Sequence, residues 1–137
     1  MGALERLLKQ LLHYTALLDG LEASDLNDVY KYLSAVYLLQ VQAQSLIDIV
    51  VRAASALGLE AEGYIDAGSK LLGAGLLSKE EFDRYRSAVR FRNIVVHQYG
   101  AVNADVVRRI LDKREYRELA KLGARLVEEL RRRGADC

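Results

Sequence analysis

The chain of 137 residues contains no proline. Average usage of about 5% would place roughly seven prolines in a chain of this length. Because proline lacks a backbone N–H and breaks helix interiors, its absence removes the strongest interruption to long helices. Apolar residues make up 51% of the chain and charged residues 28%, a balance typical of globular domains. The sequence therefore predicts a single helical domain over residues 1–137.

Apolar residues recur at helical spacing along most of the chain, and no segment alternates as a strand does. Ser78 with Glu81, and Asp112 with Glu115, each match a capping box, and Asn103 can cap a further helix. Helices are predicted, two of them short, over residues 3–18, 24–57, 64–72, 79–97, 103–111 and 112–133. We therefore expect an all-α, up-and-down bundle of four or five helices.

The second predicted helix is the longest, and its apolar residues repeat with alternating steps of four and three. The row consists of Val29, Leu33, Val36, Gln40, Ala43, Ile47, Val50, Ala54 and Leu57. Such a heptad seam indicates the central rod of a bundle. The same helix carries Gln40, Gln44 and Asp48 at spacings of four. These three form either a satisfied polar seam in the core or a line in which Asp48 orients a basic site residue.

Several functional classes do not fit the sequence. Cys137 is the only cysteine, so the chain makes no internal disulfide and no multi-cysteine zinc site, and we expect a cytoplasmic protein. No stretch approaches 18 uncharged apolar residues, which predicts that no segment spans a membrane. The glycines between residues 58 and 75 do not follow a phosphate-binding loop.

Charge is unevenly distributed along the chain. Residues 1–80 hold 6 Lys and Arg against 10 Asp and Glu, whereas residues 81–137 hold 14 against 9. This asymmetry indicates either a polyanionic partner or only solvated helix faces.

Within residues 79–97, one polar stripe holds Arg86, Arg90, Asn93 and His97. Arg92 instead falls on the side expected to face the core, and a buried unpaired charge is unfavourable. The neighbours that share this side of the helix are Tyr85, Val89 and Val96. The candidate partners of Arg92 are Asp48, Glu81, Asp83, a phosphate or a second subunit.

The spacing Arg92-x4-His97-x-Tyr99, with Asn93 after the arginine, resembles the R-x4-H-x-Y signature of HEPN-domain proteins of the HepT toxin type. Residues 44–50, with Asp48, are similar to the second-helix segment of that family, so the resemblance extends from about residue 39 to 111. It implies a four-helix core and a symmetric homodimer whose two motifs meet in a cleft.

The resemblance also implies a metal-independent RNA endonuclease, without cofactor, that acts as the toxin of a two-gene system. Arg92 and His97 are then catalytic, with Asn93 and Asp48 in support. The implied partner is an antitoxin, a small MNT-type nucleotidyltransferase that neutralises the toxin by transferring AMP to Tyr99.

The residues suit this chemistry. RNA supplies its own nucleophile, the 2′-OH, while an imidazole moves protons and a guanidinium stabilises the charged phosphorus, giving a 2′,3′-cyclic phosphate. Arg92 and His97 lie about 140° apart on a helix, so two motifs across a two-fold axis converge better than one. Arg86 and Arg90 either extend the basic surface that the RNA backbone approaches or are ordinary solvated arginines.

Two other functions stay open on the sequence alone. Some HEPN relatives are non-catalytic and serve as nucleotide-binding or regulatory partners of a nucleotidyltransferase, and the chain could also be a plain helical interaction domain. Likewise, Tyr99 is either the AMP acceptor or a tyrosine that caps the core.

Overall fold

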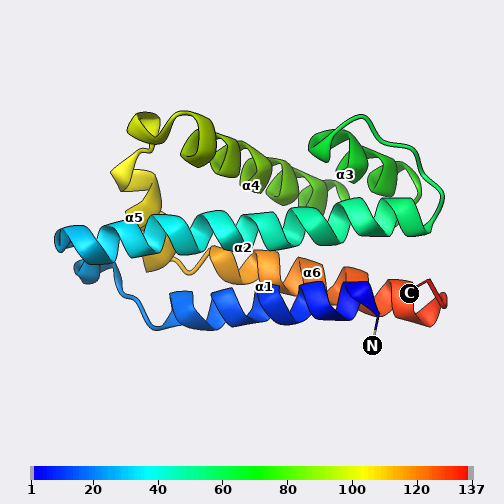
Figure 1. Cartoon of the computed structure of the whole chain (residues 1–137), viewed down its shortest axis with the longest axis horizontal. Coiled ribbons are helices and arrows are strands. Elements are labelled where there is room, and N and C mark those ends of the chain that lie inside the picture. The colour runs from blue at the N-terminus through cyan, green and yellow to red at the C-terminus, as the bar shows by residue number, and fades with distance from the viewer. Residues whose placement is uncertain (1, 136–137) are drawn as a thin grey trace.

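The computed structural model describes residues 2–135, so Cys137 lies outside the described residues. Four long helices run in alternating directions, and within residues 2–135 there is no strand (Figure 1). The helices are α1 (Ala3–Asp19), α2 (Val29–Ala56), α3 (Tyr64–Gly73), α4 (Lys79–His97), α5 (Ala104–Asp112) and α6 (Tyr116–Arg132), with 3-10 turns η1 (Ala23–Asn27) and η2 (Tyr99–Ala101). The all-α, up-and-down bundle is confirmed. The described part of the chain has six α-helices. Four of them, α1, α2, α4 and α6, are long, and two, α3 and α5, are short.

The longest helix, α2, lies at the centre, with α1 and α6 along one side and α3 and α4 along the other (Figure 1). Its heptad row is buried at Val36 and again from Ala43 to Ala54. The first two members of that row are exceptions, because Val29 is 61% exposed and Leu33 is 45% exposed. The start of α2 therefore presents apolar side chains to solvent.

The expectation that no segment spans a membrane stays a prediction, although α2 has the length and apolarity that a span requires. The 28 residues of α2 include an 18-residue window with a mean hydropathy of 1.3, which is long and apolar enough to cross a membrane. Of that window, 56% is buried inside the bundle. This burial is typical of the core helix of a folded domain.

Side-chain caps mark the starts of three of the six described α-helices, α2, α4 and α5. The capping box of Ser78 and Glu81 is confirmed, with the Glu81 amide donating to Ser78 Oγ at 3.1 Å, and Asn103 caps α5. The expected start of the second helix at residues 24–25 was wrong, because η1 occupies that segment and Asp28 caps α2. Asp28 Oδ1 accepts from the amides of Tyr30 and Lys31.

The predicted capping box at Asp112 was also wrong. Asp112 is the last residue of α5, and α6 begins only at Tyr116. Between them Arg114 adopts a left-handed conformation with φ of 52°. The Glu115 amide closes the end of α5 by donating to the Ile110 carbonyl at 3.0 Å, a geometry typical of a helix C-terminus.

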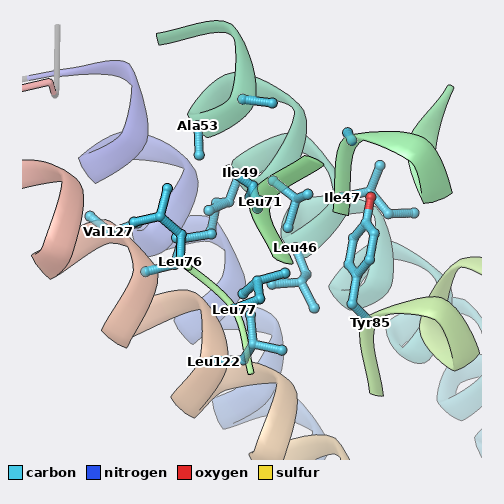
Figure 2. Packing of buried hydrophobic residues seen from close by; sticks show 14 of the residues in the cluster. Leu46, Ile47, Ile49, Ala53, Leu71, Leu76, Leu77, Tyr85, Leu122 and Val127 are labelled. Carbon is cyan, nitrogen blue, oxygen red and sulfur yellow. The ribbon is translucent and has the colours of Figure 1, made fainter. Parts of the chain in front are cut away.

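The interior consists of two apolar clusters, the larger of which joins α1, α2, α3, α4 and α6 (Figure 2). One buried polar side chain ties three helices together. Gln42 of α2 donates to Thr15 Oγ1 of α1 at 3.0 Å and to the Tyr116 carbonyl of α6 at 2.9 Å. These bonds fix the position of α2 between α1 and α6.

The contact between α3 and α4 depends on a glycine. A Cβ atom on Gly68 would lie 2.6 Å from two ring carbons of Tyr85, whereas one on Gly73 would meet nothing within 4 Å. We expect Gly68→Ala to lower the free energy of unfolding by about 1–3 kcal/mol, because the Tyr85 ring must move. The matched Gly73→Ala should be neutral or slightly stabilising. Thermal unfolding of the two variants checks this, and equal midpoints would contradict it.

Candidate functional site

Arg92 is held by three helices. Its Nε donates to Gln44 Oε1 of α2 at 2.8 Å, and its Nη1 donates to Asn93 Oδ1 at 3.0 Å. The guanidinium carbon also lies 5.6 Å from the centroid of the Tyr64 ring, at the start of α3. The side chain is half-buried, and these contacts give its guanidinium a defined direction.

Asp48 reaches Arg92 indirectly. Gln44 Nε2 donates to Asp48 Oδ1 at 2.9 Å, which directs the other amide atom, Oε1, toward Arg92. The alternative carboxylate partners were wrong. Glu81 pairs with Arg125 at 2.6 Å, and Asp83 pairs with Lys79 and Arg86.

The charge of Arg92 is not neutralised by its neighbours. Across residues 2–135, no ion pair involves Arg92, and its two hydrogen-bond acceptors are neutral amide oxygens. A guanidinium carries five N–H donors, so three of them have no acceptor in this part of the chain. Such a group is suited to bind an anion such as a phosphate.

Tyr85 connects Tyr64 to the helix that carries Arg92. The Tyr85 hydroxyl donates to the Tyr64 carbonyl at 2.6 Å, and Figure 2 shows its ring at the edge of the core beside Ile47. Burial raises the pKa of Tyr85 well above its ordinary value, and Tyr64 and Asp48 raise this pKa further. The hydroxyl therefore stays protonated and remains a hydrogen-bond donor.

His97 is the last residue of α4 and is exposed. It lies five residues from Arg92, which is about 7.5 Å along the axis and about 140° around it. Arg92 is directed to α2 and α3, and no hydrogen bond joins it to His97 within residues 2–135. Val96, which was expected on the core side, is instead 42% exposed. One chain therefore does not bring the two motif residues together.

Tyr99 lies in η2, immediately after α4, and is 47% exposed. The fold brings Tyr32 of α2 close to it. Burial raises the pKa of Tyr32, and the nearby Tyr99 raises it further. Tyr99 is therefore an exposed residue next to a less exposed tyrosine.

The two other predicted arginines differ in their surroundings. Arg86 pairs with Asp83 at 3.2 Å, and its guanidinium carbon lies 5.5 Å from the Phe82 ring centroid. Arg90 is exposed and forms no ion pair within the described residues. Arg90 is thus the more available of the two for a phosphate backbone.

Sequence reasoning missed two residues that hold Arg92. Gln44 was recognised only as part of a polar line, and Tyr64 was not recognised at all. Gln44 lies 48 residues from Arg92 in the chain, and the ring of Tyr64 meets the guanidinium only because α3 folds against α4. The spacing of four between Gln44 and Asp48 was the one available signal.

The described residues contain no group of three or more His, Cys, Asp or Glu side chains arranged to hold a metal ion. Comparison with family models matches residues 4–125 to a family described as "Ribonuclease HepT-like". The match covers most of the chain and extends beyond the 39–111 segment of the sequence resemblance. Comparison with curated proteins finds no match.

Proposed function

The chain belongs to the HepT-like ribonuclease family, and we propose that it is a toxin that cleaves RNA without a metal ion. The observation that carries this proposal is the state of Arg92. Neutral amides fix the direction of its guanidinium and leave its charge and three N–H donors for a phosphate. An uncompensated cation of this kind fits the scissile phosphate of RNA.

The proposed mechanism uses the 2′-OH of RNA as the nucleophile. His97 takes the proton from this hydroxyl, or gives one to the leaving 5′ oxygen, as an imidazole can near neutral pH. Arg92 stabilises the extra negative charge on the five-coordinate phosphorus. The P–O5′ bond then breaks, and the products are a 2′,3′-cyclic phosphate and a 5′-OH.

The proposal includes a symmetric homodimer, because Arg92 and His97 do not converge within one chain. Seven of the eleven exposed large apolar residues within residues 2–135 belong to the start of α2, the end of α4 or η2, and these segments lie at the same end of the bundle (Figure 1). The exposed apolar residues of this end of the bundle, called here the assembly face, are Val29, Tyr30, Leu33, Tyr37, Ile94, Val96 and Tyr99. Exposed apolar residues gathered at one end of a fold are typical of protein interfaces. Pairing of two assembly faces would bring together two copies of the motif.

We expect the purified protein to cleave RNA in the presence of EDTA. His97→Ala should lower the rate by about 10²–10⁴-fold through loss of proton transfer. Arg92→Ala should lower it by about 10²–10³-fold through loss of charge stabilisation. Gel analysis and end-group mapping of the products measure both effects. Circular dichroism and thermal unfolding control for folding, because Arg92 also bridges helices.

A third variant separates positioning from chemistry. Gln44→Leu removes the acceptor that directs Arg92 without removing the cation, and should lower kcat by up to about 10²-fold. Absence of cleavage by the unmodified wild-type protein would instead favour a non-catalytic partner of a nucleotidyltransferase.

The homodimer is tested by charging the assembly face. Leu33→Glu should give a monomer in sedimentation at micromolar concentration and should lose cleavage activity, because a charge would be buried at the interface. Leu12→Glu is the matched control, since both leucines are 45% exposed and Leu12 lies on α1. A wild-type monomer that still cleaves RNA would exclude the dimeric site.

We further propose that the protein is cytoplasmic, where RNA and ATP are available, and that an MNT-type nucleotidyltransferase silences it. The Tyr99 hydroxyl would attack the α-phosphorus of ATP, losing its proton and releasing pyrophosphate. The added phosphate places a negative charge two residues from His97 and competes with RNA. Exposure of Tyr99 at the end of α4 supports this role.

Incubation with the nucleotidyltransferase, Mg²⁺ and ATP should add the mass of AMP to the Tyr99 peptide in mass spectrometry. Tyr99→Phe should keep nuclease activity and escape silencing, because it lacks the acceptor hydroxyl. Tyr32→Phe is the matched control, as Tyr32 lies beside Tyr99, and it should still be modified. An adduct on any other tyrosine would refute this assignment.

A further inference from the structure

A groove next to Arg92 is not used by the proposed mechanism. It lies between α1, α2 and the start of α3, with a volume of about 620 Å³. Its lining includes Arg6 and Gln10 of α1, Asp48, Arg52 and Ser55 of α2, and Tyr64 of α3. Arg6 and Arg52 are exposed residues, and both contribute positive charge to the lining of the groove.

The groove is continuous with the Arg92 site. Tyr64 lines the groove and also lies against the Arg92 guanidinium. Asp48 lines it as well, and orients the Gln44 amide that holds Arg92. The Tyr64 backbone is fixed by the buried Tyr85 hydroxyl, and the residue is 38% exposed. A ligand in the groove would therefore sit directly beside a phosphate bound to Arg92.

The chemistry of the groove matches single-stranded RNA. Proteins bind single strands with an aromatic ring on which a base stacks and with cations that follow the phosphates. Tyr64 supplies the ring, and Arg6 and Arg52 supply the cations, while Gln10 and Ser55 add hydrogen-bonding groups. A paired base is stacked inside a duplex and cannot lie on such a ring.

A second copy of the chain is a less suitable occupant for this groove. The assembly face lies at the start of α2, whereas Arg52 and Ser55 lie at its end, about 30 Å away along the helix. The groove lining carries two arginines and a carboxylate, and interface cores are depleted in charged residues. The two surfaces therefore suit different partners.

We propose that this groove binds the unpaired nucleotide adjacent to the scissile phosphate. The base stacks on Tyr64, Arg92 engages the scissile phosphate, and the backbone continues past Arg52 and Arg6. This inference rests on the proposed ribonuclease function and adds a nucleotide-binding subsite to it.

The test measures binding of a fluorescently labelled, fully 2′-O-methylated single-stranded oligonucleotide, which lacks the nucleophile and is not cleaved. Tyr64→Leu should bind it about ten-fold more weakly, and Tyr64→Phe should bind like the wild type. Arg52→Gln should weaken binding and reduce the slope of log K against log salt by about 0.7. Arg132→Gln, on α6, is the matched arginine control and should change neither. A duplex of the same sequence should compete poorly.

The outcomes separate this inference from the proposed function. The proposed role of the groove would be overturned if Tyr64→Leu bound the oligonucleotide as tightly as the wild type. It would also be overturned if the duplex competed as well as the single strand. If binding depends on Tyr64 but unmodified RNA is not cleaved, the proposed role of the groove stands and the proposed ribonuclease function is overturned. If RNA is cleaved and neither Tyr64→Leu nor Arg52→Gln changes the KM, the proposed ribonuclease function stands and the proposed role of the groove is overturned.

Discussion

A cation held by neutral groups is the constraint around which the site is organised. Gln44 and Asn93 give the Arg92 guanidinium a direction without giving it a counter-charge. A carboxylate at position 44 would hold the guanidinium as well, but it would form an ion pair and compete with a phosphate. Asp48 lies one hydrogen bond further away, so its charge orients the amide while leaving the outer N–H groups of Arg92 open.

The outward surface of α2 changes character along its length. Apolar side chains occupy its first turns, Gln44 and Asp48 lie in the middle, and Arg52 and Ser55 lie near its end. If two copies pair through the apolar end, the polar groove of each copy stays open at the other end. Assembly and substrate binding would then use different parts of one helix, and Arg92 would lie between them.

Local signals predicted the helices well, and long-range contacts decided what was missed. The capping box of Ser78 and Glu81 involves residues three apart, so its pattern can be read directly from the chain. The similar pattern at Asp112 failed because α5 and its left-handed end at Arg114 already occupy that segment. The motif drew attention to Arg92, but the partners of its guanidinium come from α2 and α3, and only the packing of those helices reveals them.

The position of Tyr99 bears on how modification could silence such an enzyme. Tyr99 follows α4 at the assembly end, close to His97 in sequence and to Tyr32 in space, whereas the groove begins on the far side of Arg92. An AMP group on Tyr99 would therefore add charge where the two motifs are proposed to meet, and not where the flanking nucleotide is proposed to bind. On this arrangement the proposed modification would act on the proposed composite catalytic site itself, and a modified chain would still bind single-stranded RNA in its groove without cleaving it.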